Sequence, residues 1–452
     1  MNRVGASHRN RVAQTSVALY NLSDFSRRAS HTLESDLSVE DLLLTILAVA
    51  ALSMIVIAAN IADRDKRSGM RRAVIAVIAI TNGWIVLLYG VMQIFYAFTP
   101  LFESPDLAPP GKAEAIGSLI LSLVVGGLAT AILHQRVREK LAVLFLARRP
   151  AEGKTLRQAG PQSDMAPDLR LTARPDGTPL FPQMLNYYTT DDIIVPRSLA
   201  DRSSPAMPGP DSMIRGFNPD STVHMVAAVY CVYLLGIQFI NFILGGGLEG
   251  IAESFAGELT AWDLLLNALP LLIVPVLGVG LGMRRTLPQT LDRLGLKVVT
   301  VETIAVAFGA TVALLIFVAV VSMLWMGAVS EETYKEQTKA SEALSESVNS
   351  LGIAFLLAAT AAISEEIAFR GALQPIIGFW PTAIVFALTH AQYTLTPATL
   401  IILVVAVAFG WIRNRYSTTA AILTHFLYNF IPLALTVMMA EESSLWLLRI
   451  VG

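Results

Sequence analysis

The chain has 452 residues, of which 54% are hydrophobic and only 15% charged, and its mean hydropathy is +0.58. Soluble domains carry about 25% charged residues, so this composition argues against a soluble multidomain enzyme. The formal net charge of −2 gives no electrostatic basis for binding nucleic acid. The single cysteine, Cys231, excludes an intrachain disulfide and a cysteine-based zinc cluster.

Apolar stretches long enough to cross a bilayer recur along the chain, since a span needs about 20 helical residues. We therefore predict an all-α, polytopic bundle of about ten transmembrane helices. The eighth and ninth predicted spans are short, and we expect them to be tilted, re-entrant or paired as one helical hairpin buried among neighbours. The predicted spans are 41–62, 74–98, 114–134, 222–245, 263–283, 301–326, 351–374, 379–393, 398–412 and 418–438.

The charges of the loops predict the orientation, because loops rich in Lys and Arg stay on the cytoplasmic side. Basic loops follow the first, third, fifth and ninth spans, and the loops between them are acidic or nearly neutral. This alternation places both termini outside, although Arg27 and Arg28 oppose the N-terminal assignment. The basic residues are Arg64, Lys66, Arg67, Arg71, Arg72, Arg136, Arg138, Lys140, Arg148, Arg149, Arg284, Arg285, Arg293, Lys297, Arg413 and Arg415, and the acidic ones include Glu103, Asp106, Glu249, Glu253, Glu258, Glu331, Glu332, Glu342 and Glu346.

Residues 150–220 contain half of the chain's 22 prolines. Such spacing prevents a long helix and favours an extended, solvated connector. We therefore expect three parts: an N-terminal region with three spans (1–149), a Pro-rich cytoplasmic linker (150–220) and a C-terminal membrane domain (221–452). Within the linker, the apolar patch 180–195 is a candidate docking segment.

Polar and ionisable side chains interrupt three of the C-terminal spans. Such groups are costly at membrane depth and usually mark a functional site. The chain has six histidines, and the only two after residue 224 belong to this set. The three segments are Ser364-Glu365-Glu366-Ile367-Ala368-Phe369-Arg370, Phe386-Ala387-Leu388-Thr389-His390 and His425-Phe426-Leu427-Tyr428-Asn429.

The helical repeat separates the two adjacent glutamates. Positions four apart share a helix face, so Glu366 lies above Arg370 and is expected to pair with it. Glu365 is turned roughly 100° away and has no cation nearby in the sequence. An unpartnered carboxylate in apolar surroundings is the kind of group that serves as a general base near neutral pH.

The histidines offer the complementary chemistry. His425 and Asn429 share a face and could donate to a developing oxyanion. Phe386 lies one turn before His390 and is expected to pack under its ring. At 1.5 Å per residue, Glu365, His390 and His425 lie roughly 14, 16 and 10 Å from the cytoplasmic ends of their spans, which is a similar depth.

Structural interpretations of the same residues remain open. Glu366 with Arg370 is most simply a paired, buried ion pair that supports the fold. A single histidine within the membrane is often only hydrogen-bonded to a neighbouring helix. Two histidines, two glutamates and an asparagine on three spans are harder to explain by packing alone.

The three segments resemble the motifs of the type II CAAX prenyl endopeptidases and their bacterial relatives, the CAAX protease and bacteriocin-processing (Abi) family. Its first motif matches Glu365, Glu366 and Arg370. Its second motif matches Phe386 and His390, and its third matches His425 and Asn429. The similarity covers roughly 222–440, including the Leu-Gly-Leu-Lys stretch at 294–297, whereas residues 1–220 have no recognised counterpart.

The resemblance implies an intramembrane glutamate protease that uses no metal or other cofactor. Glu365 and His390 would then activate the attacking water, and His425 and Asn429 would stabilise the oxyanion. Glu366, Arg370 and Phe386 would support the site. The implied substrate is a membrane-associated protein or peptide, which is prenylated in eukaryotic members, and the family cavity opens to the cytoplasm.

Three other functions compete with this interpretation. A zinc-dependent intramembrane protease would use Glu365, His390 and His425 as metal ligands, but it would leave Asn429 without a role. A transporter or proton relay would use the buried carboxylates, although we find no internal repeat typical of transporters. A scaffold or immunity protein would keep the polar cluster only as structure.

Overall fold

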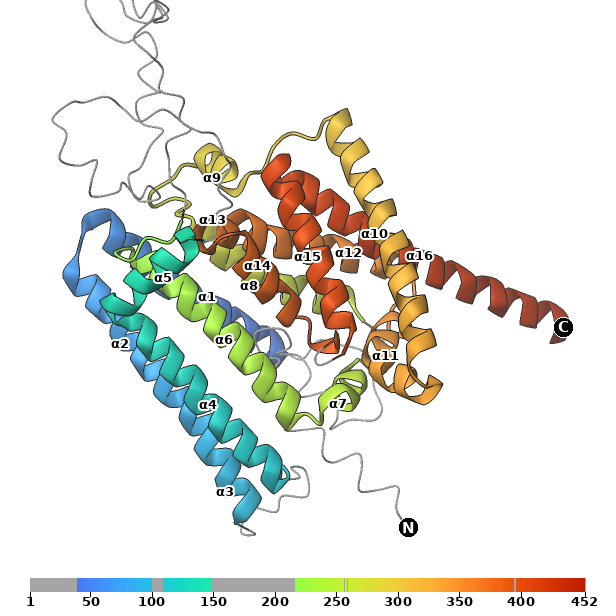
Figure 1. The fold of residues 1–452 in the computed structure, drawn as a ribbon, viewed down its shortest axis with the longest axis horizontal. Helices are drawn as coiled ribbons and strands as arrows, with labels where there is room; N and C mark the ends of the chain where they lie inside the picture. The colour runs from blue at the N-terminus through green and yellow to red at the C-terminus, as the bar shows by residue number, and fades with distance from the viewer. Residues whose placement is uncertain are drawn as a thin grey trace, which may run out of the picture.

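The computed structural model describes residues 39–99, 109–147, 216–255, 257, 259–393 and 396–451. These residues form helices and no sheet (Figure 1). Within them, nine segments are long and apolar enough to cross a membrane. Most of the predicted linker, 150–215, lies outside the described residues, as do Arg27, Arg28, Glu103, Asp106, Arg148, Arg149 and Glu258.

The nine segments correspond to nine of the ten predicted spans, which confirms the polytopic helical architecture. Two are composite, because a π-helical turn interrupts the α-helix. They are α1 (Val39–Asp65), α2–η2–α3 (Ser68–Ile85, Val86–Val91, Met92–Phe98), α4 (Lys112–Leu133), α6 (Thr222–Leu244), α8 (Ala261–Gly278), α10 (Val301–Ala328), α12–η9–α13 (Leu351–Glu365, Glu366–Leu373, Gln374–Ile377), α15 (Ala398–Arg415) and α16 (Thr418–Val451).

The eighth predicted span, 379–393, is too long, because its helix α14 runs only from Phe379 to Leu388. Ten residues rise roughly 15 Å, about half of a hydrocarbon core. The chain then turns through the short 3₁₀ helix η10 (Ala391–Tyr393), and α14 packs against α15. The eighth and ninth segments therefore form a helical pair, which is one of the three arrangements expected for them, and α14 is the one that is too short to cross.

The three N-terminal spans pack directly on the C-terminal helices. Figure 1 shows α4 beside α6, with α2 and α3 packed on α4, while α1 packs on α8 and α6. The α4–α6 contact is close because Gly236 has no side chain: a Cβ there would lie 2.1 Å from Val125. Asp63 at the end of α1 also accepts the backbone N–H groups of Thr222 and Val223, so it caps α6.

Apolar side chains on the outer helices face away from the bundle. Phe308, Ile316, Met323 and Leu324 of α10 are all more than half exposed. Exposed apolar surface on this scale would be unfavourable in water but is expected of a helix that faces lipid.

Besides α14, four α-helices among the described residues lie outside the membrane spans. They are α5 (Gln135–Ala147), α7 (Gly247–Ser254), α9 (Leu287–Leu294) and α11 (Glu331–Glu346). The last of these contains the acidic residues that we had assigned to a loop. Ser330 caps its N-terminus by accepting from Thr333 N–H, and Glu331 and Glu332 in the first turn favour the helix through its dipole.

Candidate functional site

The segment that carries Glu365, Glu366 and Arg370 is an α-helix that widens into a π-helix. The α-helix α12 ends at Glu365, and η9 begins at Glu366. Pro375 has no N–H, so it cannot donate to the carbonyl of Gly371 four residues earlier. The N–H of Gln374 donates to Phe369 O instead of Arg370 O. Two carbonyls are thus released from the helical ladder, and π-helical turns of this kind are frequent at functional sites.

Two arginines from other elements bind the released carbonyls. Arg293, on the short helix α9 (Leu287–Leu294), donates from Nη1 to Gly371 O at 3.0 Å. Arg413, in the last turn of α15, donates from Nε to Arg370 O at 3.0 Å. These bonds satisfy buried backbone acceptors, and they hold the π-helix between α9 and α15.

Glu366 lies between two cationic or protonatable groups. Its Oε1 is 3.1 Å from Nη1 of Arg370, as the four-residue spacing predicts, and also 3.1 Å from Nδ1 of His425 on α16. The side chains of Glu366, Arg370 and His425 are only 0%, 1% and 5% exposed. The second contact joins the first motif to the third, and no spacing within one helix could have predicted it.

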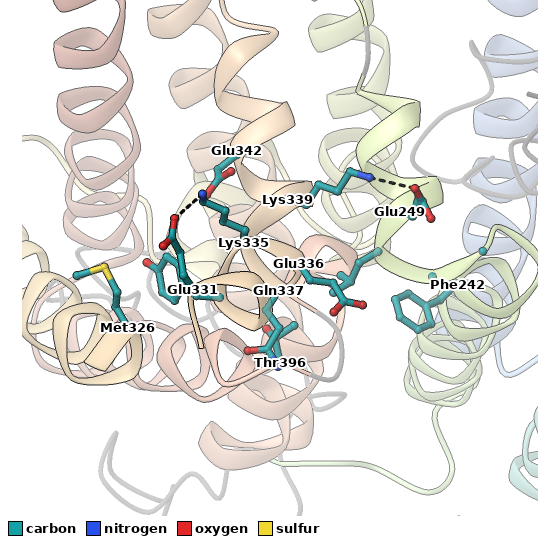
Figure 2. Close-up of a pocket in the computed structure, with 14 residues that line it drawn as sticks. Phe242, Glu249, Met326, Glu331, Lys335, Glu336, Gln337, Lys339, Glu342 and Thr396 are labelled. Carbon is teal, nitrogen blue, oxygen red and sulfur yellow. Dashed lines mark hydrogen bonds and ion pairs between the residues drawn. The ribbon is translucent and has the colours of Figure 1, made fainter. Parts of the chain in front are cut away.

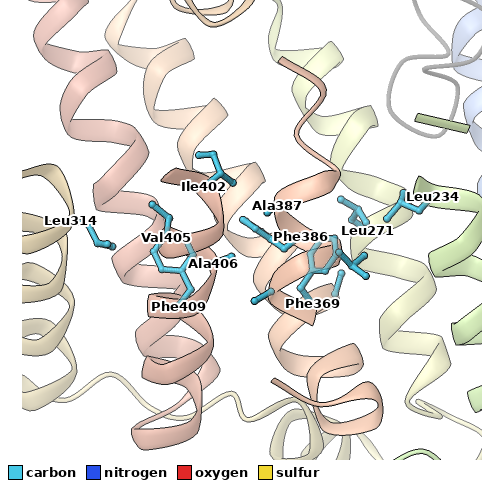
Figure 3. Packing of buried hydrophobic residues seen from close by; sticks show 13 residues of the cluster. Leu234, Leu271, Leu314, Phe369, Phe386, Ala387, Ile402, Val405, Ala406 and Phe409 are labelled. Carbon is cyan, nitrogen blue, oxygen red and sulfur yellow. The ribbon is translucent and has the colours of Figure 1, made fainter. Parts of the chain in front are cut away.

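Aromatic rings enclose the Arg370 guanidinium. Its Cζ lies 3.9 Å from the centre of the Phe386 ring and 5.5 Å from that of Phe409, and Nη2 donates to Ala406 O at 3.2 Å. A guanidinium over an aromatic face gains about 2 kcal/mol when it is desolvated. Figure 3 shows Phe386 and Phe409 within the apolar cluster where α14, α15 and η9 meet.

His390 lies just beyond the end of α14 and is fixed from two sides. Its ring packs on Phe386 at 4.7 Å between centres, as expected, and its Nδ1 is 2.8 Å from the carbonyl oxygen of Phe386. A carbonyl only accepts hydrogen bonds, so Nδ1 carries the proton and Nε2 of the neutral ring is an acceptor.

Glu365 faces that acceptor. Its Oε2 lies 4.0 Å from Nε2 of His390, which is too long for a direct hydrogen bond. Oε2 is buried and has no hydrogen-bond partner among the described residues. The side chains of Glu365 and His390 are 12% and 18% exposed, so this pair retains more contact with solvent than Glu366, Arg370 and His425.

His425 and Asn429 lie on the same face of α16. The His425 ring stacks on Phe409, with centres 4.8 Å apart and planes 28° apart. Because Nδ1 contacts Glu366, Nε2 is the ring nitrogen left to meet a substrate. Asn429 is half-buried one turn further along, and no hydrogen bond links it to another predicted site residue within the described ranges.

Three residues at the site were missed by sequence reasoning: Phe409, Arg413 and Arg293, whose bond to Gly371 O was not predicted. Phe409 contacts both Arg370 and His425, but in the sequence it is one apolar residue of an apolar span. Arg413 was noted only as a sign of orientation, yet it donates to the motif helix. In the sequence, the basic residue at the end of a span was the only signal that could have drawn attention to it.

The described residues contain no group of three His, Cys, Asp or Glu side chains placed to hold a metal ion. The set proposed for the zinc alternative was Glu365, His390 and His425. In the structure, His425 presents Nδ1 to Glu366, whereas His390 presents Nε2 to Glu365. The two histidines are therefore each associated with a different glutamate.

A large cavity of about 1220 Å³ lies between α7, α11 and the end of α6 (Figure 2). Its lining carries charged side chains, including Glu249 and Lys339, which form an ion pair at 3.1 Å. None of the seven predicted site residues lines it. One link to the site is Thr396, which donates to the carbonyl of Tyr393 at the end of the turn that follows His390.

Comparison with known proteins identifies one family. Residues 347–431 match the family model described as type II CAAX prenyl endopeptidase Rce1-like. The match contains all three motifs but is shorter than the stretch 222–440 over which we expected similarity. No curated protein and no solved structure matches the chain.

Proposed function

We propose that this chain, whose residues 347–431 belong to the Rce1-like type II CAAX prenyl endopeptidase family, is an intramembrane endopeptidase. It would hydrolyse a peptide bond of a membrane-associated protein or peptide with a water molecule activated by Glu365 and His390. The family gives the class of reaction. The observation that carries the proposal is the 4.0 Å separation of two facing acceptors, Glu365 Oε2 and His390 Nε2.

Two acceptors at this separation suit one water molecule. An ionised carboxylate and an unprotonated ring nitrogen repel each other at direct contact, but a water between them donates one hydrogen bond to each. The water then keeps its lone pairs free to attack. Both side chains are partly exposed although Glu365 Oε2 itself is buried, so solvent contacts the pair at its other atoms.

In the proposed reaction, the water oxygen attacks the scissile carbonyl carbon while Glu365 or His390 takes its proton. The carbonyl oxygen becomes an oxyanion, and Nε2–H of His425 with the amide of Asn429 would donate to it. For His425 this role requires a ring that carries both protons, because Nδ1 already faces Glu366. The C–N bond then breaks, and the proton held at Glu365 or His390 passes to the leaving nitrogen.

Glu366, Arg370 and Phe386 act as positioning residues in this scheme. Glu366 orients His425, and Arg370 holds Glu366. Phe386 supports both the Arg370 guanidinium and the His390 ring, and its carbonyl sets the tautomer of His390. The Phe386 ring also contacts His425, with centres 6.1 Å apart, so one buried aromatic residue touches both histidines.

The loop charges support a site that opens toward the cytoplasmic side. Arg293 and Arg413 belong to loops that we assign to the cytoplasm, and both bind the C-terminal part of the motif π-helix. A substrate would then approach from the cytoplasm or along the bilayer.

The proposal is tested by combining two substitutions. If Glu365 and His390 act on the same water, Glu365→Gln and His390→Ala each reduce cleavage by about 10²–10⁴-fold. The double variant is then no slower than the slower single variant, because groups that act as a unit are not additive. Losses that multiply in folded double variants would contradict a shared water.

A further inference from the structure

A second cavity lies against the motif helix, where Ala368, Phe369 and Ala372 line it. It is formed by α1, α6, α8 and η9, and it has a volume of about 120 Å³. Its walls are almost entirely apolar, with Ile55, Ala227, Leu271 and Phe369 among them. Pockets for drug-sized ligands have volumes of roughly 300–1,000 Å³, so this smaller space can enclose only a narrow segment of a ligand.

The cavity is elongated along the helix axes. Its lining on α6 extends from Val223 and His224, at the start of the helix, to Leu234. The ten residues from His224 to Leu234 correspond to a rise of roughly 15 Å. This depth and the apolar walls match an extended hydrocarbon chain.

Three arginines line the same end of the cavity as His224. They are Arg284 and Arg285, from the turn after α8, and Arg293 of α9, and the lining contains no Asp or Glu. Each guanidinium is oriented by a bond to the protein. Arg284 Nε donates to Asn60 Oδ1 at 2.7 Å, Arg285 Nη1 donates to Val279 O, and Arg293 donates to Gly371 O.

We infer that this cavity binds an anionic phospholipid, with an acyl chain between α1, α6 and α8 and its phosphate at the arginines. A basic group between transmembrane helices is the expected receptor for such a head group, and the apolar depth fits the chain. The inference is independent of the proposed proteolysis. It assigns a role to the N-terminal span α1, because α1 supplies one wall of the cavity.

A lipid bound in this cavity would be linked to the candidate active site through one aromatic contact. Phe369 lines the cavity and packs edge-to-face on Phe386 with 5.2 Å between ring centres. Phe386 in turn contacts Arg370 and His390. A chain in the cavity would therefore pack against η9, the π-helix that begins at Glu366 directly after Glu365.

Thermal unfolding of the purified full chain in detergent tests this inference. We expect dioleoyl phosphatidylglycerol to raise the unfolding temperature by several degrees more than dioleoyl phosphatidylcholine, which has the same chains but no net charge. Glycerol 3-phosphate, which has the charge but no chain, is expected to give no comparable shift. Equal shifts with the two lipids, or a full shift with glycerol phosphate, would overturn the inference.

Two pairs of variants test whether the larger thermal shift with the anionic lipid arises from binding in this cavity. Ala227→Phe fills the apolar part and should abolish the selective shift, whereas Ala305→Phe, on the exposed face of α10, should keep it. Arg284→Gln combined with Arg285→Gln should remove the preference for the anionic lipid, and the exposed Arg415→Gln should not. An undiminished shift in folded Ala227→Phe protein would contradict the assignment, even if the arginine variants fail to fold.

Discussion

The carboxylate of Glu366 lies 3.1 Å from Nδ1 of His425, so the first and third polar motifs meet through one buried hydrogen bond. The same oxygen pairs with Arg370 on its own helix. Glu366 therefore has two functions in our account: it neutralises a buried guanidinium, and it orients the histidine that faces the substrate. The adjacent Glu365 has neither contact and is left to act on water.

Glu366→Ala is expected to destabilise the fold. Removing one partner of a buried ion pair costs about 3–5 kcal/mol, because the remaining charge is left uncompensated. Chemical denaturation in detergent measures the loss, and the exposed Glu332→Ala serves as the control. If the pair is the cause, adding Arg370→Met should restore part of the free energy of unfolding. A Glu366→Ala protein as stable as wild type would contradict the structural role.

Asn429→Ala should reduce the rate of the chemical step. Loss of one oxyanion donor costs about 10²–10³-fold in kcat, and because the donor acts on the transition state, KM should change little. Cleavage kinetics provide the measurement. Thr436→Ala, about two turns further along α16, is the control for effects of altering this helix. An unchanged kcat in folded Asn429→Ala protein would remove Asn429 from the mechanism.

Much of this arrangement follows from local sequence pattern. The length of the apolar stretches predicts nine of the spans, because a segment in the bilayer must form a helix to hydrogen-bond its own backbone N–H and C=O groups. The spacing of Glu366 and Arg370 predicts their pairing, and that of Phe386 and His390 predicts their packing. Each of these features depends on residues that are neighbours along one helix or just beyond its end.

The parts that could not be predicted depend on contacts between helices. The bond from His425 to Glu366 and the stacking of Phe409 join residues from separate spans. The π-helix depends on Pro375, which lacks an N–H. It also depends on Arg293 and Arg413, which donate hydrogen bonds to the two carbonyls released from the helix. The length of α14 was overestimated because no glycine or proline marks the end of the helix at Leu388; the next one is Pro397.

The orientation predicted from loop charge can be measured with single cysteines. Cys231 is the only native cysteine, so Cys231→Ala gives a background without thiols. In intact cells, a membrane-impermeant maleimide should label Glu332→Cys but should label Arg72→Cys and Arg415→Cys only after permeabilisation. All three positions are exposed. The reverse labelling pattern would place the basic loops outside and would contradict a cytoplasmic opening.

The metal-free mechanism and the zinc alternative predict different responses to chelation. If Glu365 and His390 activate water directly, dialysis against a strong chelator should leave the cleavage rate unchanged, and metal analysis should find no stoichiometric zinc. Activity that is lost on chelation and restored by added zinc would favour the alternative, because a catalytic zinc ion itself activates the bound water.

The central claim is tested most directly by the role of Glu365 in hydrolysis. The wild-type chain and the Glu365→Gln and Glu332→Gln variants are reconstituted in vesicles with a pool of membrane-anchored peptides in H₂¹⁸O, and the products are identified by mass spectrometry. Our account predicts that wild type and Glu332→Gln release the same products with ¹⁸O in the new carboxyl group. Glu365→Gln, at an unchanged unfolding temperature, should release them about 10²–10⁴-fold more slowly. Equal cleavage by folded Glu365→Gln protein would contradict the account, and peptides left intact by the wild type would favour a transporter or scaffold.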